Sequence, residues 1–415
     1  MTDSADVRVL VITQFFVPEG QGGGYRWQRL IEHSSERTDF RVVAPPPTYP
    51  YGEYDRTYRP WKSEEIEGTD VTRLWTYQPQ KDTGLQRILN YGIFAVMASL
   101  YVLLHCWRYD CVVTMSTPHT TFLPGAIGYL LGRRWVPDIF DLWLDNAVDF
   151  GYLDGDSIAY RGISWLERAA IRWPDRVLVI TPTMAEYFAD KHGVSTAKFV
   201  QVPFGVDEEV FTPQTTAEVE RRVMYVGNLG ELQTFGPYME AFANIVADGI
   251  GAELYFVGSG ERETELRERV AALDIENRVT FTGQVPREEI PELLSSAAIS
   301  WVPLDTEHRL DYARPAKLLE SLAVGTPYVG SAVAEIEVVT EDSGAGIAVH
   351  NDPDEIAAAM TTLLCDDMER EAMGEHGVAF IDRYHRWHRL GAKAERAVRD
   401  ADKSTAPQSE VDATA

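Results

Sequence analysis

A lysine and a glutamate stand three residues apart in the segment DYARPAKLLESLAVGTP, residues 311–327. Pro315 favours the first position of a helix, because the amide hydrogen that proline lacks has no partner there, and the apolar pattern after it continues the helix. The unpaired amides of such a helix start attract phosphate. Lys317 adds a positive charge, and Glu320 on the same face can accept hydrogen bonds from a diol such as ribose. The spacing predicts a site for a nucleotide diphosphate; the alternative is an ordinary ion pair between Lys317 and Glu320 on a surface helix.

The composition narrows the class of protein. The chain has 415 residues, 45% of them hydrophobic, which is enough to bury two cores. Its formal net charge of -26 argues against nucleic-acid binding, which needs basic surface. Only seven of the 38 basic residues are lysines, against 64 acidic residues, and this balance predicts a salt-adapted surface and an origin in a halophile. It also singles out Lys317, the one lysine between Lys198 and Lys393.

Cysteines and metal-ligand patterns are sparse. Cys106, Cys111 and Cys365 show no paired C-x-x-C spacing, so we expect neither a zinc site nor a disulfide framework. Asp154 and Asp156 form a D-x-D pattern, but such strings arise readily in an acidic chain, and we expect no metal and no other cofactor. The acidic start runs directly into a strand and lacks a signal-peptide pattern, so we expect a cytoplasmic protein.

Short β-branched runs alternate with helical or loop segments along the chain. The first series comprises residues 7–12, 41–44, 111–115, 135–140 and 177–180, and the second comprises residues 223–226, 254–257, 279–282, 299–302 and 328–330. The alternation predicts an α/β protein with two Rossmann-like domains whose parallel sheets face each other across a cleft. We place the domains at residues 1–205 and 206–385, followed by a helix at 386–400 and a disordered tail at 401–415.

Glycine-rich loops follow three of the predicted strands. In an open parallel sheet the ligand binds beyond the carboxyl ends of the strands, so these loops are candidate contacts. Glycine lets backbone amides approach a phosphate or a sugar closely, although a plain flexible loop is the alternative. The loop residues are Gly22, Gly23 and Gly24 after the first strand, Gly227, Asn228 and Gly230 after the first strand of the second series, and Gly258 and Gly260 after the next.

An uncharged apolar stretch, ILNYGIFAVMASLYVLLHCW, runs from Ile88 to Trp107. Its length reaches the lower range for a membrane span, but Asn90, His105 and its place between two strands of one sheet argue against spanning. The pattern also fits a core helix and a helix that dips into the bilayer surface, and Trp and Tyr near its end suit the latter. This last reading predicts peripheral contact with the inner face of the cell membrane.

Together, these residues resemble a known family, the GT-B fold glycosyltransferases of the group-4 type, and in particular the branch that assembles polysaccharides and lipid-linked glycans. The resemblance covers nearly the whole chain. Besides the glycine-rich first loop, it rests on DIFDLWLDNAVDFGYL at residues 138–153, PFGVD at 203–207, YVGNLGELQ at 225–233, VTFTGQVPREEIPELL at 279–294 and PAKLLESLAVGTP at 315–327.

The resemblance implies a role for each part of the predicted site. Glu320 would bind the ribose hydroxyls, and Lys317 would stabilise the charge on the departing diphosphate. Gly22 to Gly24 would close on the phosphate and sugar from the other domain. The backbone that would bind the diphosphate is that around Arg314, Pro315, Ala316 and Lys317, and the segment that would contact the base edge runs from Gly283 to Val285.

Three positions depart from the pattern of the family. Tyr312 stands where the family often has a second glutamate that contacts the donor sugar, and Phe204 stands where it usually has asparagine. Asp141 stands where the family often has a histidine. We expect Asp141 to orient or deprotonate the acceptor hydroxyl, unless it is a helix cap or loop carboxylate. His119 follows a strand and is the candidate for the acceptor side, with an ordinary loop histidine as the alternative.

The expected function is a metal-independent, retaining hexosyltransferase. It would move a sugar from a nucleotide diphosphate sugar, first of all a UDP-sugar, to a glycan or polyprenyl-linked acceptor in the assembly of cell-surface polysaccharide or glycoprotein glycans. Two alternatives stay open. A degenerate GT-B protein would bind a nucleotide or glycan without transfer, and a GT-B epimerase would act on the nucleotide sugar alone.

Overall fold

The computed structural model describes residues 7–19, 22–35, 37–81, 83–149, 151–214, 220–306 and 310–400. The chain divides into two compact units, one formed by the residues up to Pro203 together with those from His388 onward, and the other by Phe204–Trp387. The sequence placed a boundary between residues 205 and 206 and set the helix at 386–400 apart, whereas the structure assigns most of that helix to the first unit. The predicted disordered tail, residues 401–415, lies outside the described residues.

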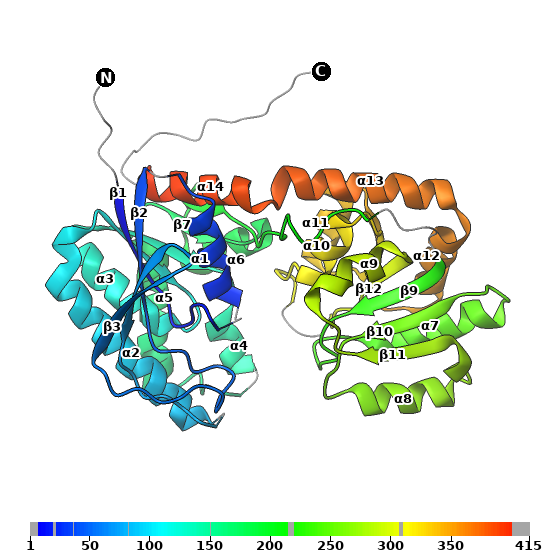
Figure 1. Ribbon diagram of the computed structural model, residues 1–415, viewed down its shortest axis with the longest axis horizontal. Helices are drawn as coiled ribbons and strands as arrows, with labels where there is room; N and C mark the ends of the chain where they lie inside the picture. Colours follow the sequence, from blue (N-terminus) through cyan, green and yellow to red (C-terminus); the bar gives the residue numbers. More distant parts are fainter. Residues whose placement is uncertain are drawn as a thin grey trace, which may run out of the picture. The chain divides into compact units, whose positions relative to one another are not determined.

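The first unit is built on a sheet with strand order β3-β4-β2-β1-β5-β6-β7-β8 (Figure 1). Neighbouring strands run parallel, except that β3 pairs antiparallel with β4 at one edge. The inner strands are largely buried, which explains their continuous apolar sequences. The strands are β1 Val7–Ile12, β2 Thr38–Ala44, β3 Trp61–Ile66, β4 Thr69–Leu74, β5 Cys111–Met115, β6 Arg134–Ile139, β7 Val177–Val179 and β8 Phe199–Gln201.

The helices of the first unit fill the connections between these strands. They are α1 Gly22–Glu32, α2 Gly84–His105, α3 Phe122–Leu130, α4 Trp143–Asp149, α5 Ile158–Arg172 and α6 Pro182–His192, and α14 Trp387–Arg399 joins them from the far end of the chain. Glu395 on α14 ties that helix to the unit: its carboxylate accepts hydrogen bonds from the Ser35 amide (2.9 Å) and the Thr38 hydroxyl (2.7 Å).

Helix α2 carries the long apolar stretch noted in the sequence. It begins after Thr83, whose hydroxyl accepts a hydrogen bond from the Gln86 amide. One face, with Phe94, Ala98 and Val102, packs into a buried cluster with residues of β1, β2, β4 and β5. Gly84–Arg108 is the one candidate span among the described residues by length and composition. Because a spanning helix would leave this side of the sheet uncovered, the placement argues against a membrane span.

The second unit has a parallel sheet with strand order β11-β10-β9-β12-β13-β14. Both units are therefore Rossmann-like, and the predicted fold class is confirmed. The strands are β9 Glu220–Val226, β10 Glu253–Val257, β11 Val279–Gly283, β12 Ala297–Val302, β13 Tyr328–Ser331 and β14 Gly346–Val349. The helices are α7 Phe235–Ala247, α8 Glu263–Ala272, α9 Ile290–Ser295, α10 Ala316–Ala323, α11 Ala334–Ser343, α12 Pro353–Cys365 and α13 Asp367–Tyr384.

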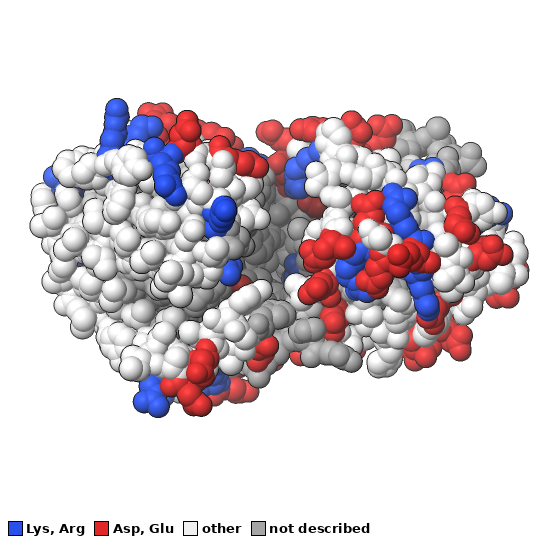
Figure 2. Space-filling view, turned by 90° about the horizontal axis from the view of Figure 1, so that it is seen from below, with Lys and Arg blue, Asp and Glu red and all other residues white. Residues whose placement is uncertain are grey.

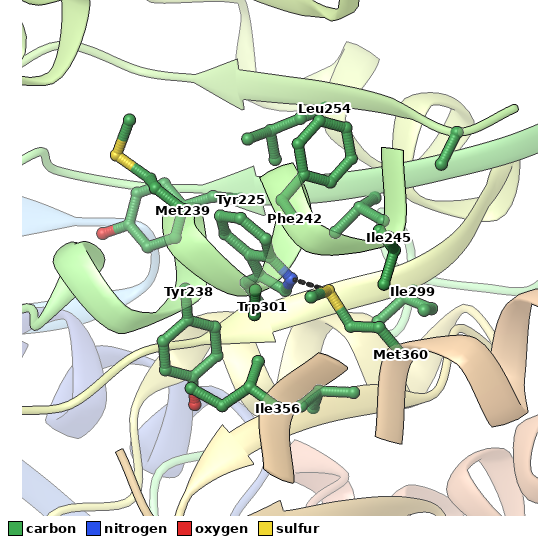
Figure 3. Packing of buried hydrophobic residues seen from close by; sticks show 14 of the residues in the cluster. Tyr225, Tyr238, Met239, Phe242, Ile245, Leu254, Ile299, Trp301, Ile356 and Met360 are labelled. Atoms are coloured by element: carbon green, nitrogen blue, oxygen red, sulfur yellow. Dashed lines mark hydrogen bonds between the residues drawn. The ribbon is translucent and has the colours of Figure 1, made fainter. Parts of the chain in front are cut away.

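Successive residues of β9 point into two different buried clusters. Val223 and Tyr225 belong to the cluster formed with α7 and α12, and Met224 and Val226 belong to the one formed with α10 and α11. In the first cluster Trp301 lies between side chains of α7 and α12, and its indole N–H points to the sulfur of Met360 at 3.2 Å (Figure 3). This packing on both faces fixes the strands, so their carboxyl ends are rigid supports for the loops that follow.

Candidate functional site

The strand order of the second sheet reverses between β9 and β12. From β9 the chain continues outward through β10 and β11, and from β12 it continues outward on the other side through β13 and β14. Connections that leave such a pair of strands in opposite directions open a crevice beyond the carboxyl ends of the strands, and ligands bind there in open α/β sheets. The residues after Val226 and after Val302 therefore form the candidate site.

The glycine-rich loops after β9, β10 and β11 pack directly on one another. The Gly227 amide donates to the Val257 carbonyl (2.9 Å), and the Gly258 amide donates to the Gly283 carbonyl (2.8 Å). A Cβ on Gly258 would lie 2.1 Å from the Gly227 oxygen, and one on Gly260 would lie 2.3 Å from the Leu229 oxygen. Gly258 and Gly260 are thus required by contacts between loops, which is a different reason from the predicted approach to a phosphate.

Helix α10 starts where the sequence predicted, with one difference. Pro315 is the residue before the first helical turn, with extended backbone, and Ala316 is the first helical residue. Within the part of the chain that the structure describes, no side chain caps this turn, so its free amides remain available to solvent or to a ligand. Leu318, Leu319 and Leu322 on the buried side of the helix fix it against the core.

Lys317 projects from the first turn of α10 toward the end of β9. Its ammonium donates a hydrogen bond to the Tyr225 hydroxyl (2.6 Å) and lies 4.2 Å from the centre of that ring. A Cβ on Gly227 would come within 3.4 Å of the Lys317 nitrogen, so the glycine leaves room for the cation. Burial lowers the pKa of Lys317 to about 7, although the negative charge of Glu320 opposes this shift. The site thus holds a poorly solvated cation that an incoming anion would stabilise.

Glu320 lies one turn further along α10, with its side chain 12% exposed. Its carboxylate pairs with the Arg287 guanidinium at 2.9 Å, and Arg287 in turn lies over the ring of Phe211. Burial raises the pKa of Glu320, while the charges of Arg287 and Lys317 partly offset that effect. Among the described residues, Lys317 and Glu320 each bond to another partner, so the alternative of an ion pair between them does not occur.

The guanidinium of Arg314 is engaged elsewhere. It pairs with the buried carboxylate of Glu335 (2.7 Å) and approaches Nε2 of His385 at 3.3 Å. Any contact of Arg314 with a ligand would therefore come from its backbone, as the resemblance implied. Tyr312, which replaces the family's second glutamate, is buried.

The other predicted residues of this unit lie in the loops around Lys317. The Asn228 carbonyl accepts a hydrogen bond from the Tyr225 hydroxyl (2.5 Å), so Tyr225 links the β9 loop to Lys317. The Gly230 amide donates to the Gln233 side chain (3.1 Å). Beyond Gly283, Val285 is half-buried and packs against the α10 side of the core. The structure thus brings the β9 loop and α10 together around one cation.

The predicted glycine loop of the first unit is partly helical. Gly20 and Gln21 lie outside the described residues, and α1 begins at Gly22, so the three glycines form its first turn. A Cβ on Gly23 would lie 2.6 Å from the Phe140 ring, and one on Gly24 would lie 2.5 Å from the Phe15 carbonyl oxygen. These glycines let the first turn of α1 pack tightly against the loops after β1 and β6.

Asp141 is half-buried in the turn between β6 and α4. Its Oδ1 accepts a hydrogen bond from the Asn146 side chain at 3.0 Å. This bond fixes the carboxylate at the carboxyl end of the sheet, where a catalytic group of this fold is expected. It leaves the predicted role with the acceptor untested.

His119 does not have the surface position that an acceptor contact requires. It is fully buried, its Nδ1 lies 2.8 Å from the Ser116 carbonyl, and its Nε2 lies 3.1 Å from the Glu167 carboxylate. Burial would raise the pKa of Glu167, but bonds to His119 and His192 and the charge of Lys191 hold it well below its ordinary value. The prediction for His119 is therefore replaced by a structural role in a buried charged network.

Sequence reasoning missed a buried ion pair in the first unit. The guanidinium of Arg26 on α1 donates two hydrogen bonds to the carboxylate of Asp138 near the end of β6 (3.1 and 3.2 Å). It also donates to the carbonyls of Val202 and Pro203 (2.6 Å each). Both charged side chains are fully buried, and the Trp27 indole adds a further bond to Asp138 (2.7 Å). An arginine two residues after the glycine run was the available signal. The cluster holds the start of α1 against two strand ends.

Metal ligands do not gather in the parts of the chain covered by the structure. There, no group of three or more histidine, cysteine, aspartate or glutamate residues is placed to hold an ion. Asp154 instead accepts a hydrogen bond from the Asp156 amide (2.9 Å) in the turn before α5. The D-x-D pattern therefore has a local structural use.

Two protein-family descriptions match the chain. Residues 21–205 match the glycosyl transferase 4-like domain, and residues 220–366 match the glycosyl transferases of group 1, so the two matches cover most of the first and second units. The chain belongs to the GT-B glycosyltransferases of this group 1 and group 4-like type. The expected origin in a halophile finds no support in these comparisons and stays a prediction.

Individual proteins with similar sequence or structure agree with this family. The chain is 28% identical over 285 residues to a D-inositol 3-phosphate glycosyltransferase of Acidothermus cellulolyticus. The matched region covers 64% of this chain but only 62% of that relative. Sucrose-phosphate synthase from Thermosynechococcus elongatus has the same fold (TM-score 0.69, 19% identity, 95% and 98% of the two chains). So does HepE of Anabaena, solved in complex with UDP (TM-score 0.68, 13% identity, 95% and 100%).

Proposed function

We propose that this protein is a retaining glycosyltransferase that uses a nucleotide diphosphate sugar and transfers the sugar to a glycan or lipid-linked acceptor. The family supports transfer from a nucleotide sugar. The finer statement about the acceptor rests on the motifs that resemble the polysaccharide branch. Because a protein of the same fold was solved with UDP, uridine is the first base to test.

The observation that carries the proposal is the environment of Lys317. Its ammonium lies at the switch point of the second sheet, against the glycine loop after β9 and beside the uncapped start of α10. A diphosphate placed there would meet a cation, free amides and the positive end of a helix dipole. Burial lowers the pKa of Lys317 to about 7 and the nearby charge of Glu320 offsets this only in part, so a bound anion would favour the charged form of the lysine.

The neighbouring groups suit the rest of a nucleotide. Glu320 is three residues from Lys317 and could accept hydrogen bonds from ribose hydroxyls, in exchange for or together with its bond to Arg287. The segment from Gly283 to Val285 follows β11 at the same edge of the sheet and is our candidate for contact with the base.

In the proposed reaction, the bond between the anomeric carbon and the diphosphate oxygen breaks, and the diphosphate leaves with the electron pair. The acceptor oxygen bonds to the carbon on the face that the diphosphate vacates and gives its proton to a base, for which Asp141 is our candidate. Lys317 and the amides of α10 stabilise the charge on the leaving group, and removing one such donor typically lowers the rate roughly 10²- to 10³-fold. We propose that the reaction needs no metal.

The alternatives make different predictions for one assay. A transferase releases UDP from UDP-glucose only when an acceptor such as an oligosaccharide or a polyprenyl-linked sugar is added. A degenerate binding protein, which the replacement of a glutamate by Tyr312 would suit, gives a thermal shift with UDP but no release. An epimerase converts the nucleotide sugar without any acceptor.

A variant of Asp141 separates chemistry from donor binding. Asp141→Asn should lower acceptor-dependent UDP release by about 10²-fold while the affinity for UDP stays unchanged, because a base acts on the acceptor and not on the nucleotide. Asp156→Asn, in an exposed turn, is the matched control and should behave as wild type. Wild-type turnover in Asp141→Asn would remove Asp141 from the mechanism.

A further inference from the structure

The outer face of α2 is apolar along its whole length. Its side chains at helical spacing are between 42% and 70% exposed, although the opposite face of the same helix is buried in the sheet. The exposed residues are Leu85, Ile88, Leu89, Val96, Leu100, Leu103, Leu104 and Trp107. We call these residues the α2 face. Exposed apolar patches of this extent mark interaction sites rather than ordinary surface.

The apolar surface continues onto the helices next to α2. Leu130 at the end of α3 is 71% exposed, and α3 packs against both α2 and α5. Trp165 on α5, also exposed, contacts Trp173, whose ring stacks with Tyr129 of α3. The surface is therefore broad enough to lie against an extended partner and is not confined to a single groove.

Acidic residues avoid this region of a strongly acidic chain. Between residues 83 and 134 the only acidic residue is Asp110, and it pairs with Arg8. The same segment contains Arg87 near the start of α2 and exposed Arg108 just beyond its end. In Figure 2 the unit that contains α2 shows a largely uncharged face, whereas acidic side chains are frequent on the other unit. The charge of the segment from residue 83 to residue 134 thus suits an anionic partner, which the net charge of -26 on the whole chain would otherwise repel.

We propose that the α2 face docks onto the surface of a bilayer that contains anionic phospholipid. A helix of this length presents about 33 Å of continuous apolar side chains, and the α2 face offers no polar groups for the hydrogen bonds that protein interfaces normally contain. The Arg108 guanidinium lies 5.0 Å from the Trp107 ring, and this pair of residue types suits the headgroup level of a membrane. Asn90 keeps its hydrogen bonds to Gln14 and Tyr77, and the buried side of α2 stays packed against the sheet, so the helix lies on the membrane surface and does not cross it.

This proposal goes beyond the proposed function and does not depend on it, because lipid binding needs neither donor nor acceptor. The direct test is co-sedimentation of the full chain with vesicles of phosphatidylcholine, with and without phosphatidylglycerol. Wild type should pellet with the anionic vesicles and much less with the neutral ones, and added salt should weaken the binding because it screens the arginines.

Two sets of variants locate the surface. Ile88→Gln combined with Leu100→Gln and Leu104→Gln should lower the partition coefficient tenfold or more, on the order of what the loss of several inserted apolar side chains removes. The control, Tyr58→Gln with Trp61→Gln and Met368→Gln, replaces apolar residues outside the α2 face that are even more exposed, and it should pellet as wild type. Arg87→Glu with Arg108→Glu should abolish the preference for anionic vesicles.

Circular dichroism melting establishes that each variant is folded, which is expected because the replaced side chains are exposed. Failure of wild type to pellet with anionic vesicles would overturn the proposal, as would unchanged pelleting of the α2 triple variant. A second copy of the chain is the competing occupant. It predicts a lipid-free dimer in sedimentation equilibrium that the triple variant dissociates, and that outcome would also overturn membrane docking.

Discussion

The charge of Lys317 should make nucleotide binding depend on pH in a direction that the structure fixes. Burial lowers the pKa of this lysine to about 7 in the free protein. A bound diphosphate would add negative charge next to the ammonium and return the pKa toward the ordinary lysine value of about 10.4. Binding should therefore take up a proton above pH 7, and the affinity for UDP should fall as the pH rises.

The magnitude follows from the fraction of protein that is protonated before binding. At pH 7 about half of the Lys317 side chains carry a charge, and at pH 9 only about 1% do, so the affinity should fall about fiftyfold across this interval. The diphosphate itself does not contribute to this slope, because phosphate groups of this type complete their ionisation near pH 6. At pH 8 the complex should take up about 0.9 proton per site.

Isothermal titration calorimetry with UDP, in two buffers of different ionisation enthalpy, measures both quantities. Lys317→Met should bind weakly with little slope between pH 7 and 9, and Lys317→Arg should keep its charge and also lose the slope. A wild-type affinity that is flat over this interval, or an equal slope in Lys317→Met, would refute the assignment of the diphosphate to Lys317.

Three further perturbations test other parts of the structure. Glu320→Gln should weaken the binding of UDP about tenfold, because hydrogen bonds to a charged group are lost, but should leave the binding of inorganic pyrophosphate unaffected. Glu292→Gln on α9 is the control in the same calorimetric titrations. Gly258→Ala should destabilise the protein by at least about 2 kcal/mol in denaturant unfolding, because the backbone there has φ near +133° and the added Cβ would meet Gly227. Gly236→Ala, where the added Cβ would meet open space, should be neutral. Equal stabilities of the two variants would contradict the packing argument. Glu167→Gln should cost about 3 kcal/mol at pH 7, compared with no effect for exposed Glu186→Gln, because it breaks a buried charged network. Since the pKa of Glu167 is lowered by folding, its contribution is present above the unfolded pKa and lost in acid, so the deficit measured by thermal unfolding should shrink below about pH 4.5, and a pH-independent deficit would point to packing alone.

The inner strands were predictable because burial on both faces demands continuous apolar runs. Residues 111–115 and 328–330 were located to within a residue, since a strand between two layers of helices has no polar face. The hairpin of β3 and β4 was missed, because β3 reads WKSEEI and is largely exposed at the sheet edge. Its turn at Glu67 and Gly68 has positive φ at both residues, and Gly68 was the local signal for this turn in the sequence.

The candidate site was predictable as positions and not as contacts. A lysine and a glutamate after a proline mark the start of α10, but the sequence does not contain the information that Tyr225 and Arg287 reach them from β9 and the loop after β11. The same limit applies to His119, because its partner Glu167 is 48 residues away and only the fold brings them together. Long-range pairing of this kind depends on how the elements pack.

The return of α14 to the first unit has a consequence for biosynthesis. The ribosome completes the sheet of that unit when Pro203 emerges, but Ser35 and Thr38 acquire their carboxylate partner only after the whole second unit has been translated. The amino-terminal unit can therefore reach its final state only after the carboxy-terminal unit has been synthesised, and the carboxy-terminal unit is in effect an insertion that can complete its own folding before then.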